Sequence, residues 1–406
     1  MPGTETSANG PVADKVRRIA RLDLPGAGQV TVSGNHCYIG HLPGHDGLGT
    51  SIVDVADPAH PKVVAQVMLD DPDSHSHKVR VAGDVMIVNH EENNRGIGRK
   101  AEEMQDARAR LLETLGRQPS DSELAERLGL NEADIAVLME AEQQPYDNGG
   151  FKIYDVARPA DPRLLHYQKT GGKGVHRFDM DERYAYISTE MDGYRGNILV
   201  IYDIADPARP REVSRWWMPG QHLAGGETPH WQGRQHRLHH ALRFGDRLWA
   251  SVWHAGLRVI DISDLSAPKT IGSHNYHPPF PAPTHTVMPV PFKVEGRDLM
   301  LAIDEEDAYY NPTEAARRKG QPRANLWVFD VTDIDAITPL SIFQVGERDS
   351  PWSRTPYSRF GAHQFHEKMA GSLVYCAWFS GGLRIVDVAD PFAPQEVGSF
   401  VPEPVA

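Results

Sequence analysis

One short pattern recurs six times along the chain and constrains its fold more than any other feature. Alternating apolar residues lead into an aspartate, and a turn rich in Asp and Pro usually follows. Alternation with a period of two indicates a strand, and the Asp and Pro cluster indicates a tight turn. The copies read SIVDVADPAHP from Ser51, FKIYDVARPADP from Phe151, LVIYDIADPARP from Leu199, LRVIDISDLSAP from Leu257, LWVFDVTDIDAITP from Leu326 and LRIVDVADPFAP from Leu383.

Further short strands accompany each copy. Another apolar segment follows it, such as KVVAQVML, and two strands joined by a tight turn precede it, as in HKVRVAGDVMIVNHE from His77. Four short strands repeated about every 50 to 70 residues are typical of propeller blades. We therefore predict an all-β, six-bladed β-propeller, with seven blades as the alternative, as a single domain over residues 14–406. The segment KVRRIARLDL near the N-terminus has no blade of its own and is expected to complete a blade with the C-terminal strands.

The recurring strand also resembles a known family. LRIVDVADP, LRVIDISDL and SIVDVADP are similar to the strand that gives the LVIVD-repeat propellers their name, and the resemblance covers nearly the whole chain outside residues 97–145. It implies the propeller fold. It does not imply a function, because one fold hosts many activities.

Composition excludes several classes of partner. The formal net charge is −13, from 42 Lys and Arg against 55 Asp and Glu, with no basic block, whereas nucleic-acid binding requires a cationic surface. No apolar run reaches the roughly 18 residues that span a bilayer, and the N-terminus lacks the order of a signal peptide. The two cysteines, Cys37 and Cys376, do not form a disulfide framework. We expect a cytoplasmic protein that binds neither nucleic acid nor membranes.

The long insertions fall in two kinds of connection. With the strands of a blade lettered A to D from the centre outward, each long insertion joins B to C or D to the next A, and in a four-stranded meander both connections lie on one face. That face is the expected functional face, because binding residues concentrate on loops held by a rigid scaffold. The insertions are residues 92–149, 219–239, 275–284, 306–325 and 347–360.

The largest insertion, residues 97–145, is predicted to be helical. RKAEEMQDARARLLETLG has apolar residues at helical spacing, and SDSELAERLGL opens with a capping box, either Ser120 with Glu123 or one formed by Ser122. LGRQPSDSELAERLGLNEADIAVLMEA resembles the helical linker region of bacterial sigma factors, although its acidic balance argues against DNA binding. We interpret the insertion as a lid over the channel or a contact in a homo-oligomer. A tolerated surface insertion is the alternative.

The chain contains 20 histidines, and several of them share one position in the repeat. Aligning the blades on the A–B turn places a histidine at the start of innermost strand A in five blades, where the imidazoles would converge at the channel mouth. Three or four imidazoles with open positions suit a transition metal. Alternatively, repeat duplication retained a histidine with a structural role. The predicted metal ligands are His77, His176, His240 (with His239 as the neighbour that could replace it), His285 and His363.

A glutamate recurs at the end of strand B on the same rim. Glu91, Glu190 and Glu305 superpose in the alignment, and a carboxylate there could orient a ligating imidazole or transfer protons. These three are the candidate catalytic residues. The candidate substrate contacts are His90, His239, His254, Trp253, Tyr309 and Trp378.

Together these patterns predict a metalloenzyme acting on a small organic substrate. Iron, copper or manganese is the favoured metal, zinc is possible, and an oxidoreductase is the favoured reaction class. The layout is similar, by architecture alone, to carotenoid-cleaving oxygenases, which hold iron on four histidines backed by glutamates, and to selenium-binding propellers that oxidise methanethiol with copper. A metal-activated hydrolase or lyase and a non-enzymatic binding scaffold are the alternatives.

Overall fold

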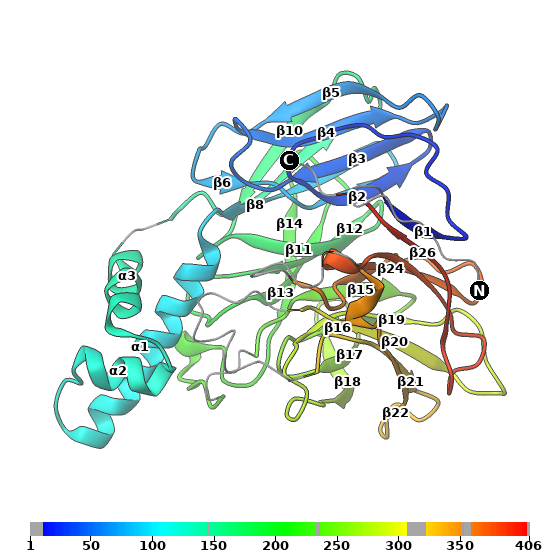
Figure 1. Ribbon diagram of the computed structural model, residues 1–406. Coiled ribbons are helices and arrows are strands. Elements are labelled where there is room, and N and C mark those ends of the chain that lie inside the picture. The colour runs from blue at the N-terminus through cyan, green and yellow to red at the C-terminus, as the bar shows by residue number, and fades with distance from the viewer. Residues whose placement is uncertain are drawn as a thin grey trace. The chain divides into compact units, whose positions relative to one another are not determined.

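The strands form six antiparallel sheets of four or five strands, and the fold is a six-bladed β-propeller, as the repeat predicts (Figure 1). This computed structural model describes residues 11–143, 146–231, 236–306, 322–350, 352 and 359–403. The chain divides into two compact units with three sheets each. The N-terminal unit comprises Ala20–Leu238 and Leu265–Ala267, and the C-terminal unit comprises Met1–Ile19, His239–Asp264 and Pro268–Ala406.

The N-terminal unit contains the first three sheets. Two of them are simple meanders, β2-β3-β4-β5 and β11-β12-β13-β14, whereas in the second sheet β6 and β7 both pair with β8, which pairs with β9 and then β10. Their bounds are β2 Ala27–Ser33, β3 His36–His41, β4 Leu48–Asp54, β5 Lys62–Met68, β6 Ser74–His75, β7 Val79–Ala82, β8 Val85–Glu92, β9 Gly150–Asp155, β10 Arg163–Lys169, β11 Val175–Met180, β12 Tyr184–Thr189, β13 Ile198–Asp203 and β14 Arg211–Trp216, with the short helix η1 Leu223–Gly225.

The C-terminal unit contains the other three sheets. Two are four-stranded meanders, and the last has the order β1-β26-β25-β24-β23. The bounds are β1 Val12–Asp14, β15 His240–Phe244, β16 Arg247–Ser251, β17 Leu257–Asp261, β18 Lys269–His274, β19 Thr284–Pro289, β20 Leu299–Asp304, β21 Leu326–Asp330, β22 Thr338–Phe343, β23 Gln364–Phe365, β24 Leu373–Trp378, β25 Gly382–Asp387 and β26 Gln395–Val401, with the short helices η2 Glu347–Asp349 and η3 Phe379–Gly381.

The N-terminal segment pairs with the last sheet, but at a different place from the one predicted. The paired strand is β1, in which Val12 lies opposite Val401, and residues 15–24 of KVRRIARLDL form no strand. The physical reason is the adjacent pair Arg17 and Arg18, which breaks the alternation; the Arg18 guanidinium instead pairs with Glu403.

The recurring motif is the third strand of every sheet, and its aspartate closes the turn that follows. In each copy the carboxylate accepts a hydrogen bond from the backbone N–H two residues later, which stabilises a turn without help from a sheet partner. This local bond explains why the turn recurs with the motif. The six pairs are Asp54 with Ala56, Asp155 with Ala157, Asp203 with Ala205, Asp261 with Ser263, Asp330 with Thr332 and Asp387 with Ala389.

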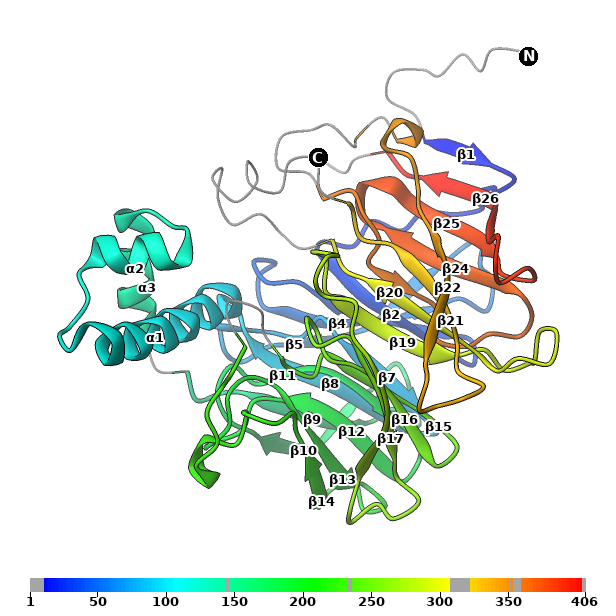
Figure 2. The same ribbon diagram turned by 90° about the horizontal axis from the view of Figure 1, so that it is seen from below.

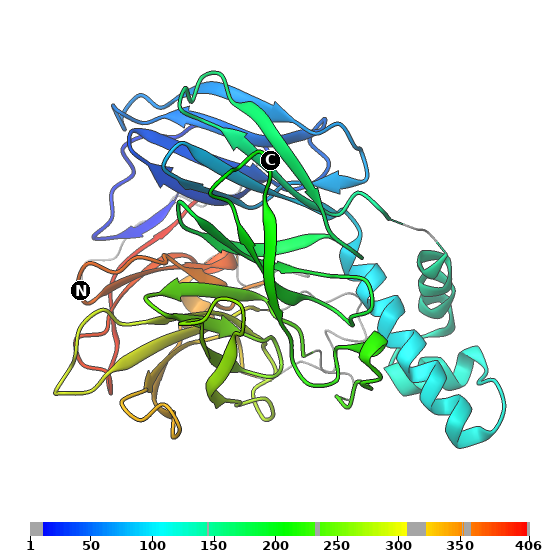
Figure 3. The same ribbon diagram turned by 180° about the vertical axis from the view of Figure 1, so that it is seen from behind.

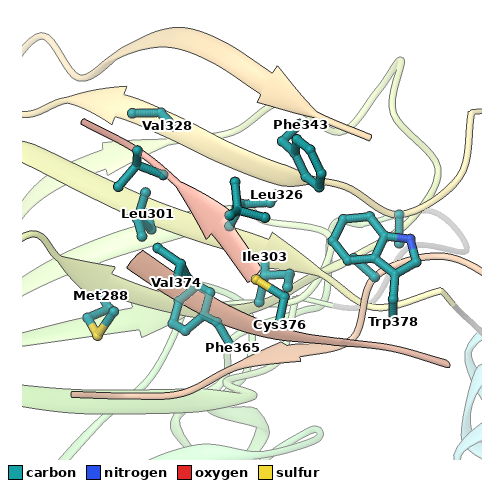
Figure 4. Packing of buried hydrophobic residues seen from close by; sticks show 14 of the residues in the cluster. Met288, Leu301, Ile303, Leu326, Val328, Phe343, Phe365, Val374, Cys376 and Trp378 are labelled. Carbon is teal, nitrogen blue, oxygen red and sulfur yellow. The ribbon is translucent and has the colours of Figure 1, made fainter. Parts of the chain in front are cut away.

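Apolar side chains pack between neighbouring sheets. In the C-terminal unit one cluster joins strands β19 to β22 to strands β23 to β25, as Figure 4 shows for Leu301, Leu326 and Val374. Trp378, expected from the sequence to contact substrate, lies in this cluster with 1% of its surface exposed. Its place there follows from the strand, because alternate side chains of β24 point into the core.

The insertion forms three helices between β8 and β9: α1 Arg95–Leu115, α2 Asp121–Leu128 and α3 Glu132–Glu142. Ser120 and Glu123 make the predicted capping box, and Asn131 with Asp134 makes a second one. The helices share an apolar core that includes Met104. Figures 2 and 3 show α1 leading away from the end of β8, with α2 and α3 packed along it. Among the described residues no helix is long and apolar enough to cross a membrane.

Candidate metal site

Two groups of histidine and glutamate side chains could each hold a metal ion within the described part of the chain. The N-terminal histidine group is His75, His77 and Glu91, and the C-terminal histidine group is His239, His285 and Glu305; within each group the candidate ligand atoms lie within 4.8 Å of one another. The five predicted ligands are divided between the units: His77 and His176 lie in the N-terminal unit, and His240, His285 and His363 lie in the C-terminal unit.

Neighbouring strands bring the C-terminal histidine group together. His239 directly precedes β15, His285 lies near the start of β19, and Glu305 directly follows β20. The rings of His239 and His285 are 4.0 Å apart between centroids, and His285 Nε2 is 3.8 Å from Glu305 Oε2. Both rings are buried. His285 occupies a β-bulge, since the pairing jumps from Thr284 to Thr286, and a bulge redirects a side chain relative to the strand.

The hydrogen bonds of the two Nδ1 atoms fix which ring nitrogens carry protons. His239 Nδ1 lies 2.6 Å from the carbonyl oxygen of His285, which can only accept, so the ring donates. His285 Nδ1 lies 2.9 Å from Thr286 Oγ1, and the Thr286 hydroxyl donates to Gln364 Oε1 at 2.7 Å. The Gln364 amide is oriented by its Nε2, which donates to the carbonyl oxygen of Phe365. Nε2 is therefore the nitrogen that each neutral ring offers to a metal, in the arrangement typical of metal-ligating histidines.

Aromatic and cationic side chains surround Glu305. The Arg359 guanidinium donates to Glu305 Oε1 at 2.5 Å and lies 3.7 Å from the centre of the Phe379 ring. The His363 ring stacks on Phe379, with 4.5 Å between ring centroids, and meets the His285 ring edge-on, with 4.6 Å between centroids. One carboxylate oxygen of Glu305 is thus held by a cation, the other faces His285, and a third imidazole lies alongside.

His240 points away from this group. Consecutive residues of an extended chain face opposite sides, and His240 Nδ1 lies 3.5 Å from a carboxylate oxygen of Glu367. Its neighbour His239 is the one that meets His285. The centroids of the Trp253 and His239 rings are 5.3 Å apart. His254 lies edge-on beside Trp253, with 6.2 Å between the ring centroids. Tyr309 lies outside the described residues.

The N-terminal histidine group is assembled from strand β6, the segment that joins it to β7, and strand β8. His75 Nε2 lies 3.6 Å from Glu91 Oε2, and the His75 and His77 ring centroids are 4.6 Å apart. His176, which occupies a β-bulge of β11 equivalent to that of His285, lies 5.8 Å from His77 between centroids. Its Nδ1 is 3.0 Å from both oxygens of Glu91. Glu91 is completely buried.

Two arginines of the helical insertion reach into this group. Arg95 Nη1 lies 2.9 Å from His75 Nε2, and its Nε lies 3.3 Å from Glu91 Oε1. Arg99 Nη2 lies 3.1 Å from the same oxygen. These arginines are not among the residues predicted from the sequence, although their i, i+4 spacing places them on one helix face a few residues after Glu91. Protein donors therefore occupy acceptor atoms that a metal would need.

Burial favours the neutral forms of the imidazoles of His75, His77 and His176. It lowers the pKa of His75 to about 4 and lowers the pKa values of His77 and His176 well below the usual range, with nearby cations adding to the effect. Neutral rings can accept as well as donate hydrogen bonds. That is how His75 accepts from Arg95.

The remaining predicted residues of this unit lie beside the group. Glu190 directly follows β12, accepts a hydrogen bond from the Lys173 backbone at 2.7 Å and lies 3.4 Å from Arg99 Nε. His90 points to the opposite side of β8 from Glu91: its Nδ1 is 2.8 Å from the Asn148 carbonyl oxygen.

Comparison with family models identifies LVIVD repeats in this chain. The LVIVD repeat model matches residues 26–68, 179–216, 245–275 and 368–401, which include copies of the recurring motif. The sigma-70 region 3 model matches residues 99–146, within and just beyond the helical insertion. No curated protein is detectably similar to the chain.

Solved structures share the fold at low sequence identity. A periplasmic gluconolactonase from Pseudomonas aeruginosa superposes with a TM-score of 0.56 at 12% identity, covering 99% of this chain and 97% of its own. A protein described as a putative 6-phosphogluconolactonase from Bacteroides uniformis gives a TM-score of 0.53 at 7% identity, covering 92% and 84%. At these identities the similarity concerns the fold alone.

Proposed function

We propose that this LVIVD-repeat propeller is a metal-dependent enzyme whose metal ion is held by His239, His285 and Glu305. The observation that carries the proposal is the set of hydrogen bonds that take up the Nδ1 protons of both histidines and direct their Nε2 atoms to the ion. Two histidines and one carboxylate leave coordination positions open for water and substrate. A metal ion bound there supplies Lewis acidity and lowers the pKa of a coordinated water.

The surrounding residues have separate roles in this proposal. Arg359 holds one oxygen of Glu305 and leaves the other directed at His285. His363 lies against the His285 ring, so it is the candidate for proton transfer to substrate. Phe379 packs between the Arg359 guanidinium and the His363 ring, which keeps water from part of the site.

The reaction we favour is hydrolysis of a small ester or lactone. Two histidines with one glutamate are the ligand set of several zinc hydrolases. The gluconolactonase and the putative 6-phosphogluconolactonase that share the fold are both described as lactonases, which supports this choice through the fold.

An oxygenase is the second candidate. Two histidines and one carboxylate are also the donor types of the facial triad that would hold ferrous iron. The sequence-based preference for iron, copper or manganese applies to this candidate. The bound metal separates the two, because zinc cannot change its oxidation state whereas iron can.

Elemental analysis of protein purified without an affinity tag tests the site. We expect about one equivalent of a transition metal, and less than about 0.2 equivalents would contradict the proposal, given the tight binding of such sites. His239→Ala should lose this metal. His240→Gln is the matched control, since His240 is adjacent in sequence and faces Glu367, and it should keep the metal.

Activity assays then separate the reaction classes. Glucono-δ-lactone hydrolysis that disappears with a chelator and returns with zinc would support the hydrolase. If the purified protein contains iron, shows no lactone hydrolysis and consumes oxygen with reduced organic substrates, the oxygenase is the better description.

A further inference from the structure

We infer that the N-terminal histidine group is a second cation site, in which the Arg95 guanidinium and a divalent metal ion compete for His75, His77 and Glu91. The inference does not depend on the proposed function, because the groups concerned share no residue. It assigns to the helical insertion a role beyond packing: the start of α1 is released when a metal binds.

The first observation is the position of a buried negative charge. Glu91 has no exposed surface, and a buried carboxylate is strongly destabilising unless a cation and hydrogen bonds compensate it. Arg95 places its guanidinium between Glu91 Oε1 and His75 Nε2, at 3.3 and 2.9 Å. Those two residues are also candidate metal ligands, so the guanidinium occupies part of the space a metal would need.

The second observation is that the two arginines are held differently. Arg99 is nearly buried and contacts Glu91, Glu190 and Asn197. Arg95 is the first residue of α1, a quarter of its side chain is exposed, and no side chain caps the helix there. Arg95 can therefore swing toward solvent by unwinding the first turn, while Arg99 remains in place.

Withdrawal of Arg95 would leave a suitable set of ligand atoms. His75 Nε2 loses its donor, and Glu91 Oε2 already lies 3.6 Å from it. The hydrogen bond from Asn89 Nδ2 to His77 Nδ1, at 3.5 Å, is at the limit of such bonds and is easily replaced. A dication also replaces the positive charge that leaves with Arg95, so the charge of Glu91 stays compensated.

Zinc binding to the full-length protein tests the competition. We expect the wild type to bind one zinc ion tightly and a second one more weakly, because the second must displace Arg95. Arg95→Met should tighten this second site by at least about tenfold, since a nearby positive charge is removed. The double variant Arg95→Met, His75→Ala should lose the second site and keep the first.

Arg108→Met is the matched control. Arg108 also lies on α1, and its guanidinium pairs with Glu142 inside the insertion, away from the histidines. It should leave both zinc affinities unchanged. Equal weak affinities in the wild type and Arg95→Met, or a second site that survives His75→Ala, would overturn the inference and leave Arg95 as a structural anchor alone.

Hydrogen exchange measured by mass spectrometry provides an independent readout. As the second zinc ion binds to the wild type, amides of residues 95–99 should exchange faster, because the first turn of α1 is released. Unchanged exchange at saturating zinc would overturn the coupling. His239→Ala should abolish the tight site and keep this response, so failure of the proposed function and failure of this inference are distinguishable.

Discussion

The two histidine groups contain the same kinds of residue, yet the hydrogen bonds made by their imidazoles have opposite polarity. In the C-terminal histidine group the atoms that bond the imidazoles are acceptors: a carbonyl oxygen and a hydroxyl oxygen receive the Nδ1 protons of His239 and His285, while Arg359 donates to the carboxylate of Glu305. In the N-terminal histidine group the surrounding atoms are donors, and Arg95 and Arg99 bind the imidazole and carboxylate directly. Proximity of histidines and glutamates alone therefore does not define a metal site. The polarity of the outer hydrogen bonds decides what the group binds.

Removing the buried cation of the N-terminal unit should have the largest effect on stability. Arg99→Met leaves Glu91 and Glu190 buried without one of their partners. Breaking such a buried pair costs about 3 to 5 kcal/mol of unfolding free energy. Chemical denaturation measures the loss. Arg108→Met is the control: it breaks the partly exposed ion pair with Glu142 and should cost less than about 1 kcal/mol. Equal losses would show that Arg99 is not the main anchor of the insertion.

Removing a ligand of the C-terminal histidine group should have the next largest effect. His285→Ala takes away one ligand and the ring that contacts His239 and His363. We expect metal affinity to fall by at least about a hundredfold, the upper end of the effect of losing an outer-shell partner. Competition with a chromophoric chelator measures it. Retention of full metal affinity would contradict the proposed site.

Changing only the hydrogen-bond polarity sharpens the comparison further. Thr286→Val keeps the shape of the side chain and removes the acceptor of the His285 Nδ1 proton. Metal affinity should fall by about 10- to 100-fold, as for other outer-shell partners. Thr338→Val, an exposed threonine on β22 of the same sheet, is the control and should have no effect. If both variants bind metal as the wild type does, hydrogen-bond polarity is not the deciding feature.

The smallest predicted effect concerns the folding of the insertion itself. Ser120→Ala removes the capping box of α2 and should cost about 1 kcal/mol of stability. Because Ser120 lies far along the chain from Arg95 and Arg99, zinc binding at either group should not change. Thermal unfolding and the zinc titration check the two halves of this prediction. A change in zinc affinity would mean that the insertion folds and docks as one unit.

The sequence by itself determined the features that depend on local chemistry. Each motif aspartate bonds a backbone N–H only two residues away, so the strand and its turn are readable from a short segment. The same holds for the capping box at Ser120. Alternation of apolar residues then identified six sheets, and with them the propeller.

Only the tertiary structure decided which side chains meet. A shift of one residue turns a strand residue to the opposite face, so the repeat alignment could not separate His239 from His240. The bond from Thr286 to Gln364 joins residues 78 positions apart, and the contact of Arg99 with Glu190 joins residues 91 apart. These partners set the protons on the imidazoles and the charge beside the glutamates. They act through contacts between strands and helices, which no local pattern in the sequence encodes.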